Sequence, residues 1–298
     1  MDRGPWLALV LVLSMVLAGC GGTAGVQTRD PFSVPETSVP DPSETESMRA
    51  TPPFSPDPET DTLGDPAVFL DSQARRLEGT SYSLDYELDV RYDNGTRWNN
   101  VVVDARFARN QSIYVSNVTQ RGRALNVTRL AYVNGSRLYA ARGPAGLSPS
   151  AANFSIARTA DGTPVPPGEG VTLRALRPEF LYNGFSSMNV TVVRELDRVP
   201  AGVSDQLFYV RATEVTQPDT LVNNAFTGGD DAGVENATLE AIVASDGFVY
   251  EYRIEYTVVR EDGTHLTVSR RLIYRNVGTT TVAVPSTWGT NNTTTAVR

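Results

Sequence analysis

The chain has no lysine, one cysteine and one histidine among its 298 residues. Without lysine, the protein cannot form a Schiff base with a carbonyl substrate. With a single cysteine it cannot form a disulfide within the chain, so its stability must come from a packed core. One cysteine and one histidine also supply too few ligands for a transition-metal site. We therefore expect no cofactor and no metal centre.

Basic residues are outnumbered by acidic residues. All 26 basic residues are arginines, against 34 acidic residues, which gives a net charge of −8 and a pI of about 4.8. The arginines are not clustered, so nothing indicates a nucleic-acid partner. The acidic excess lies in residues 23–66, with nine acids and two arginines, whereas the chain from Ala67 onward is nearly neutral. An acidic chain without lysine is typical of extreme halophiles. A GC-rich genome, which encodes arginine in place of lysine, is the alternative explanation for the missing lysine.

The N-terminal apolar run is short. Residues 6–18 are thirteen apolar-leaning residues, and Leu17, Ala18 and Gly19 directly precede Cys20. A run of this length suits the core of a signal peptide and falls short of the ~20 residues that span a bilayer. The segment resembles the lipobox of exported lipoproteins, a family in which the leader is cut before the cysteine and the sulfur receives a lipid. An ordinary cleaved signal, with Cys20 incidental, is the alternative.

These features predict a signal peptide over 1–19 and a lipidated Cys20 that anchors the protein to the outer face of the cell membrane. Residues 20–66 contain nine prolines and no apolar periodicity, which indicates a disordered acidic tether. Residues 67–285 are expected to form one antiparallel β-domain, and residues 286–298 a disordered tail.

The domain is predicted to begin with a helix. Asp65 and Pro66 are favourable at a helix start, and Leu70, Ala74 and Leu77 would share its apolar face. Period-two alternation then dominates, most regularly over 82–92 and 250–258. Turn dipeptides such as Asn94–Gly95 and Asp246–Gly247 join successive strands. We expect a mainly β (α+β) fold: a curved antiparallel sheet or half-barrel of about ten strands, with one or two central helices on its concave face.

Tyrosines are concentrated on the apolar sides of two predicted strands. A closed core would be built more simply from Phe, Leu and Ile, whereas tyrosine adds a hydroxyl that needs a partner. A partly open concave sheet holding an amphipathic ligand would explain the choice, and a tyrosine-rich packed core is the alternative. The predicted ligand-lining residues are Tyr82, Tyr86, Leu88, Tyr250, Tyr252, Ile254 and Tyr256, with Leu173, Leu176, Phe180 and Leu181 as a helical lid.

Ten Asn-x-Ser/Thr triplets without an intervening proline are glycosylation candidates. Some of them arise by chance in a chain rich in Asn, Ser and Thr, but two lie at predicted hairpin turns, where a glycan fits. The asparagines are Asn94, Asn110, Asn117, Asn126, Asn134, Asn153, Asn189, Asn236, Asn291 and the overlapping Asn292.

Catalytic motifs are weak. His265 follows a predicted turn, and there is no G-x-S-x-G segment, so we expect a solvent-facing strand histidine and no catalytic triad. The acidic loop 228–235 could hold a hard cation but lacks the ligand spacing of a calcium loop. Paired carboxylates such as Glu251 and Glu255 would be required for glycosidase-like chemistry. A solvated strand face is the simpler interpretation.

The order of lipobox, acidic tether, helix, strand meander, central helices and final hairpins resembles haloarchaeal surface lipoproteins. Over residues 67–284 it also resembles the bacterial lipoprotein-carrier class, which includes the mycobacterial lipid-binding lipoproteins. The resemblance implies a half-closed barrel with helices over a hydrophobic cavity, and it brings no catalytic residues.

We therefore favour a non-enzymatic, membrane-anchored surface lipoprotein that binds or carries a hydrophobic ligand, either a lipid or an acylated partner. The alternatives are a glycosylated structural or adhesive protein that contacts surface-layer components, and a hydrolase of envelope polymers that uses paired carboxylates.

Overall fold

The computed structural model describes residues 65–111, 113–123, 125–166, 179–196, 206–223 and 231–283. All of them belong to one compact unit, Met48–Arg298. The predicted leader, Cys20, nearly all of the predicted tether and the predicted tail lie outside the described residues. Within the described ranges, no helix has the length and apolar character needed to cross a membrane.

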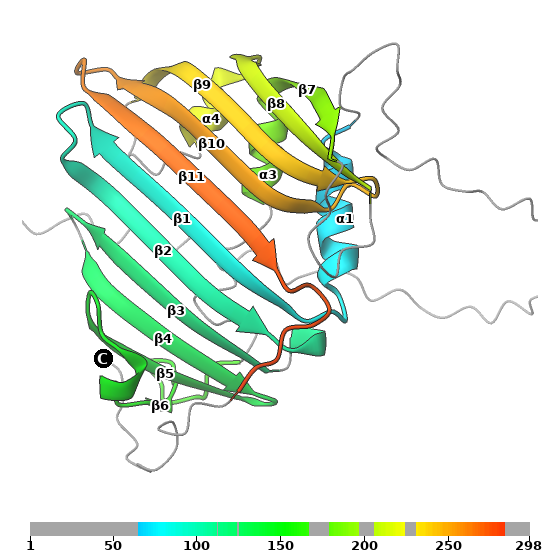
Figure 1. The fold of residues 1–298 in the computed structure, drawn as a ribbon. Coiled ribbons are helices and arrows are strands. Elements are labelled where there is room, and N and C mark those ends of the chain that lie inside the picture. The colour runs from blue at the N-terminus through cyan, green and yellow to red at the C-terminus, as the bar shows by residue number, and fades with distance from the viewer. Residues whose placement is uncertain are drawn as a thin grey trace, which may run out of the picture. The chain divides into compact units, whose positions relative to one another are not determined.

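Eleven antiparallel strands form one open, curved sheet (Figure 1). Their spatial order is β6-β5-β4-β3-β2-β1-β11-β10-β9-β8-β7, so the sheet consists of two meanders joined where β1 pairs with β11. The predicted fold class is confirmed, with eleven strands where about ten are expected. The strands are β1 (Tyr82–Tyr92), β2 (Arg97–Phe107), β3 (Ile113–Gly122), β4 (Asn126–Asn134), β5 (Arg137–Pro144), β6 (Ser155–Ile156), β7 (Met188–Glu195), β8 (Leu207–Val215), β9 (Asp231–Ala244), β10 (Val249–Arg260) and β11 (His265–Arg275).

The predicted hairpin turns are present. Gly95 between β1 and β2 has φ +77°, and Gly247 between β9 and β10 has φ +88°, a backbone region that glycine enters at little cost. The preceding polar side chains hold these turns. Asn94 Oδ1 accepts the Thr96 N–H at 2.9 Å, and Asp246 Oδ1 accepts the Phe248 N–H at 2.9 Å.

Alternation along the strands gives the sheet two different faces. In β1 the even-numbered residues from Tyr82 to Val90 are buried, and the intervening residues are half-buried or exposed. Strands β10 and β11 continue this buried face, which we call the inner face. The opposite, charged face is the outer face.

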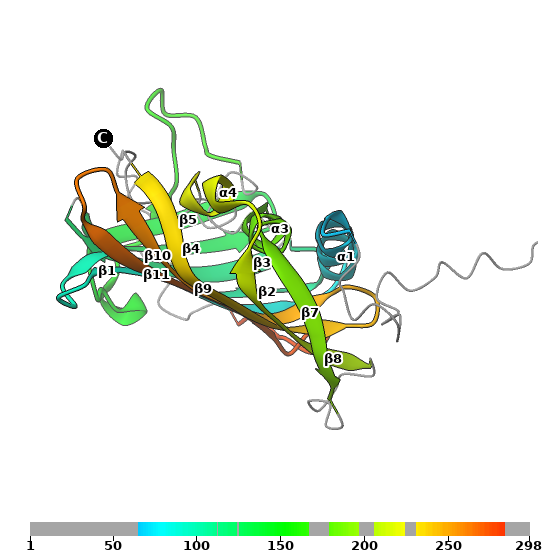
Figure 2. The same cartoon turned by 90° about the horizontal axis from the view of Figure 1, so that it is seen from above.

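Three described helices lie against the inner face: α1 (Ala67–Leu77), α3 (Glu179–Ser186) and α4 (Pro218–Asn223). Figure 2 shows α3 and α4 on the concave side of the sheet. Phe180 of α3 contacts the ring of Tyr86, and the Tyr256 hydroxyl donates to the Leu221 carbonyl of α4 at 3.2 Å. The predicted placement of central helices on the concave face is therefore correct.

The predicted apolar face of α1 is wrong. Leu70 and Leu77 are only half-buried and Ala74 is exposed, whereas Phe69, Ser72 and Gln73 are buried. The helix turns this more polar side inward because the loop between β9 and β10 offers it hydrogen-bonding groups. Asp65 nevertheless acts at the helix start as expected, since its Oδ1 accepts the Ala67 N–H at 2.9 Å.

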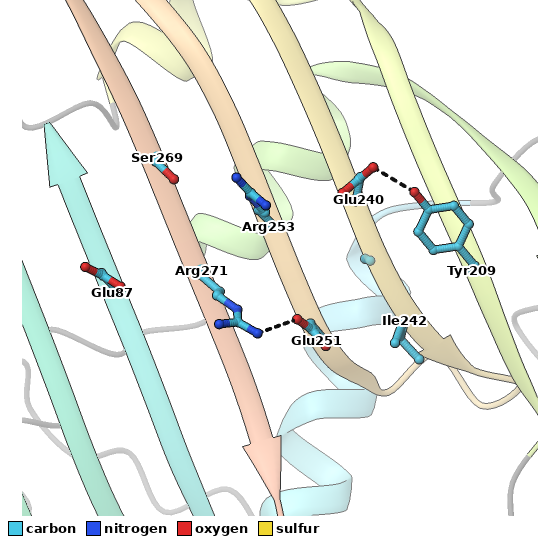
Figure 3. Close-up of a pocket in the computed structure, with 9 residues that line it drawn as sticks. Glu87, Tyr209, Glu240, Ile242, Glu251, Arg253, Ser269 and Arg271 are labelled. Atoms are coloured by element: carbon cyan, nitrogen blue, oxygen red, sulfur yellow. Dashed lines mark hydrogen bonds and ion pairs between the residues drawn. The ribbon is translucent and has the colours of Figure 1, made fainter. Parts of the chain in front are cut away.

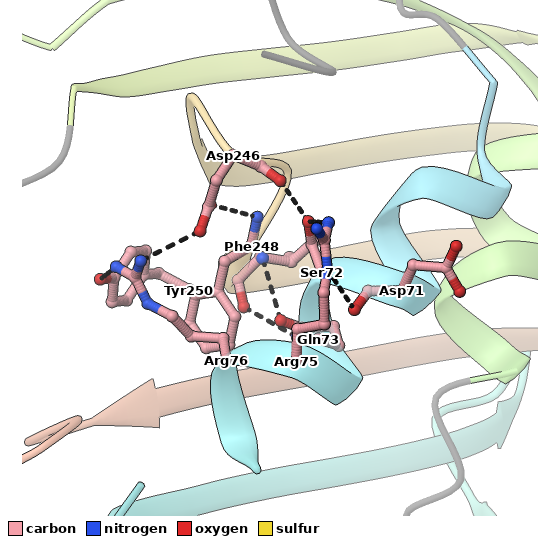
Figure 4. A network of polar contacts seen from close by, with 9 residues as sticks. Asp71, Ser72, Gln73, Arg75, Arg76, Asp246, Phe248 and Tyr250 are labelled. Atoms are coloured by element: carbon pink, nitrogen blue, oxygen red, sulfur yellow. Dashed lines mark hydrogen bonds and ion pairs between the residues drawn. The ribbon is translucent and has the colours of Figure 1, made fainter. Parts of the chain in front are cut away.

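A polar network fixes α1 to the β9–β10 hairpin (Figure 4). The Gln73 Nε2 donates to the Val249 carbonyl at 3.1 Å, and its Oε1 accepts the Val249 N–H at 3.2 Å. Ser72 donates to the Asp246 carbonyl. Arg76 donates to the Asp246 carboxylate at 3.0 Å and to the Tyr250 hydroxyl at 2.9 Å. One side of α1 thus completes the hydrogen bonding at the start of β10.

Candidate functional site

The predicted ligand-lining residues of the sheet all lie on the inner face and are buried. Tyr252 and Ile254 are at most 1 % exposed, and Tyr250 is the most accessible at 9 %. In the predicted lid, Leu181 is buried and Phe180 half-buried on α3, whereas Leu173 and Leu176 lie outside the described residues. The other predicted lining residues of the sheet also belong to the hydrophobic core of the domain. They are Tyr82, Tyr86, Leu88 and Tyr256.

Aromatic rings from four elements, α1, α3, β1 and β10, form a continuous layer between the helices and the sheet. Phe180 lies 5.7 Å from Tyr86 and 5.9 Å from Tyr252, measured between ring centroids. Phe185 lies 5.7 Å from Tyr252 and 4.4 Å from Phe69 of α1. We call these five residues the aromatic layer. Phe180 and Phe185 occupy the space where the sequence predicts a ligand, so a ligand bound there must displace α3.

Arg270 lies within this apolar region. The sequence pattern shows it interrupting the apolar face of β11, and the structure places its side chain inside, at 3 % exposure. Its guanidinium carbon lies 5.3 Å from the centroid of the Phe180 ring, and the Tyr86 hydroxyl is hydrogen-bonded to the guanidinium. Burial opposes the charge of Arg270, but the phenol oxygens of Tyr86, Tyr256 and Tyr252 outweigh it, so its pKa is raised.

The tyrosine hydroxyls of the inner face differ in their surroundings. Burial raises the pKa of Tyr86, and the neighbouring Arg270 partly offsets this. Burial also raises the pKa of Tyr252, whose hydroxyl has no hydrogen-bond partner among the described residues. Tyr256, by contrast, donates to the Leu221 carbonyl. An unsatisfied buried hydroxyl is costly. Packing alone therefore does not explain why position 252 is a tyrosine.

Gly184 lets α3 approach this hydroxyl. A Cβ at Gly184 would overlap the Tyr252 hydroxyl and lie 2.9 Å from its Cζ. We expect Gly184→Ala to destabilise the domain by about 1–2 kcal/mol, because overpacking costs more than the ~1 kcal/mol that alanine gains in helix propensity. Urea unfolding measures the change. Tyr252→Phe in the same chain should recover part of the loss, and a Gly184→Ala chain as stable as the wild type would contradict the close contact.

The outer face carries a polar hollow of about 560 Å³ (Figure 3). It spans β1 and β8 to β11, with Tyr209 and Ile242 among its lining residues. The Tyr209 hydroxyl donates to Glu240 at 2.8 Å, and Arg271 forms an ion pair with Glu251 at 3.0 Å. Exposed pairs of this kind contribute only about 0–1 kcal/mol.

The predicted carboxylate pair is not assembled in this hollow. Glu251 lines it, whereas Glu255 does not and is paired with Arg253 at 3.1 Å. His265 is half-buried at the start of β11, opposite Val259. The acidic loop 228–235 lies mostly outside the described residues, and no metal-ligating group of three acids or histidines occurs in the described part.

The glycosylation candidates differ in accessibility. Asn117 is half-buried on β3; Asn291 and Asn292, and the side chain of Asn110, lie outside the described set. Most of the exposed candidates lie at turns, in loops or near strand ends, and Asn236 lies within β9. The exposed asparagines are Asn94, Asn126, Asn134, Asn153, Asn189 and Asn236.

No protein-family model and no curated protein matches this chain. Among solved structures, a DUF1329 family protein from Desulfovibrio piger is 8% identical over 72% of this chain and 95% of its own, with a TM-score of 0.20. An outer membrane lipoprotein-sorting protein domain from Vibrio parahaemolyticus is 6% identical over 70% and 92%, at 0.21. Lipovitellin is 9% identical over 70% and 26%, at 0.27. At these scores the likenesses say nothing about what this chain binds.

Proposed function

We propose that the domain binds a hydrophobic or amphipathic ligand on its inner face, beneath α3, and performs no catalysis. We also propose that Cys20 is lipidated and holds the protein at the outer face of the cell membrane. The observation that carries the binding proposal is the aromatic layer. It joins a short helix to an open, apolar sheet through ring contacts, and it includes hydroxyl groups that a purely structural core does not need.

The helices differ in how they are held. The described contacts of α1 with the β9–β10 hairpin include backbone hydrogen bonds through Gln73. The described contacts of α3 with β1 and β10 include those of Phe180 and Phe185 with tyrosine rings, each worth about 0.5–1.5 kcal/mol beyond its buried area. An apolar ligand that replaces these rings offsets the cost of moving α3, because it covers the same surface.

Native mass spectrometry of the full chain, purified gently from its own host, tests the proposal. We expect a co-purifying hydrophobic mass that disappears after organic extraction. A chain carrying only its own mass, with or without glycans, would contradict ligand binding. It would instead favour the structural surface role, for which the six exposed sequon asparagines provide attachment points.

Photo-crosslinking locates the ligand. A neutral diazirine-labelled fatty acid ester should modify residues of β1, β10 and α3 that face inward, such as Tyr86 and Phe180. Tyr209 is the internal control, because it lines the outer hollow and offers a comparable ring. Adducts that form on Tyr209 and not on the inner face would show that the ligand binds elsewhere.

A further inference from the structure

We infer that the inner face is built for an anionic amphiphile, whose carboxylate or phosphate head group binds between Arg270 and Tyr252 while its chain covers the apolar sheet. The inference rests on the proposed function and specifies its ligand class.

The position of Arg270 in the sheet is the first observation. The buried residues that β1, β10 and β11 contribute to the inner face are Tyr, Leu, Val and Ile, with Arg270 as the single charged member. In the strand register it lies opposite Leu88 on one side and Ile254 on the other. An apolar residue would fit this position without the desolvation cost of a guanidinium, and a buried charge by itself is weak evidence for stability. A role in binding explains why a charge is placed here.

The chemistry of the surroundings is the second observation. A guanidinium offers five N–H donors in a planar fork that matches a carboxylate or phosphate. The groups that set its electrostatics are phenols, which are protonated at neutral pH, and burial raises the pKa of Tyr86 and Tyr252 further. Phenols can donate to an anion without repelling it. The cluster therefore presents donors and positive charge to whatever enters beneath α3.

The unsatisfied hydroxyl of Tyr252 is the third observation. It is fully buried, has no hydrogen-bond partner among the described residues, and lies so close to Gly184 of α3 that a Cβ there would overlap it. When α3 moves away from the sheet, this hydroxyl and the Arg270 guanidinium become accessible on the same side. An oxyanion between them would give the hydroxyl the acceptor that it lacks in the present structure.

The flanking residues suit the chain of an amphiphile. Along β11, Leu266 and Val268 precede Arg270 on the inner face, and Leu272 and Tyr274 follow it. A head group at Arg270 thus has apolar surface on both sides. A small free anion would use only the centre, whereas an amphiphile uses the whole face.

A pair of fluorescent probes tests the inference on the purified full chain: a pyrene-labelled long-chain fatty acid and its methyl ester. We expect the wild type to bind the acid on the order of tenfold more tightly than the ester, since a charged head group adds charge-assisted hydrogen bonds. In Arg270→Met this preference should disappear while ester binding is retained. Arg270→Lys should keep part of it, because the charge remains and the fork is lost. Tyr252→Phe should reduce it without abolishing ester binding.

The outcomes separate the two proposals. Equal binding of acid and ester by the wild type, or an unchanged preference in Arg270→Met, would overturn the head-group site and leave hydrophobic binding intact. If neither probe binds the wild type, the proposed function itself fails. Acetate and inorganic phosphate serve as competitors that test whether the site binds a small free anion. Displacement of the acid by either at millimolar concentration would show a small-anion site and overturn the amphiphile assignment. A lysophosphatidic acid competitor distinguishes a phosphate from a carboxylate head group.

Discussion

Raising the pH above about 10 is expected to unfold the domain in one cooperative step, because several tyrosines are buried in their neutral form. Burial raises the pKa of Tyr114 to about 12 and that of Tyr82, Tyr252 and Tyr274 further. An unfolded tyrosine titrates near 10. The folded state holds these protons more tightly, so their stabilising effect is complete below the unfolded pKa and is lost as the pH rises toward the folded pKa.

The size of this effect exceeds that of any single substitution. Each unit of pKa difference corresponds to about 1.4 kcal/mol, so at pH 12 each fully protected tyrosine can cost about 2–3 kcal/mol of unfolding free energy. Three or four such residues together approach the ~5–15 kcal/mol of total stability of a domain. Tyrosinate absorbance and near-ultraviolet circular dichroism should therefore change together. Tyr274→Phe should shift the midpoint to higher pH. Gradual ionisation with an unchanged dichroism spectrum would contradict the burial of these hydroxyls.

Gln73→Ala is expected to destabilise the domain by about 3 kcal/mol. The side chain satisfies both the N–H and the carbonyl of Val249, and the residue is 1 % exposed. Its removal leaves two buried backbone groups without partners, each worth about 1–3 kcal/mol. Urea unfolding measures the loss.

Two matched variants separate hydrogen bonding from packing at this position. Gln73→Met keeps the length of the side chain and removes both polar groups, so it should lose nearly as much stability as Gln73→Ala. Arg75→Ala, on the exposed side of the same helix, should change stability by less than about 0.5 kcal/mol. A Gln73→Met variant with wild-type stability would show that the helix is held by packing alone.

The strands were predictable because period-two alternation and turn chemistry act locally. Tyr82 to Tyr92 alternate as expected, and Asn94–Gly95 closes the hairpin where the sequence places it. The pairing of β1 with β11 was not predictable in this way. No local signal links residues near 87 to residues near 271, and their register depends on the shared inner face of the completed sheet.

The two least predictable features are both polar groups turned inward. On α1, the sequence favours burial of Leu70 and Leu77, but Gln73 and Ser72 are buried because backbone groups of a distant hairpin need partners. On β11, the pattern identifies Arg270 as an interruption of the apolar face, and only the assembled structure shows that tyrosines from two other strands surround it. The spacing of Phe69, Ser72, Gln73 and Arg76 on one helix face was the available signal for α1.

The seam between the two meanders has a mechanical consequence. The chain enters β1 and leaves β11 at the same end of the sheet, where Ser83 lies opposite Arg275 and the Gly278 N–H donates to the Ser81 carbonyl at 2.7 Å. A force that reaches β1 and β11 through Ser81 and Gly278 therefore pulls these two antiparallel strands apart from one end. The hydrogen-bonded pairs between β1 and β11 then break one after another, as in unzipping. In a shear geometry all of these pairs would resist the force together. Once α1 has been pulled from the β9–β10 hairpin, a domain held at both ends would yield along this line, with each meander still intact.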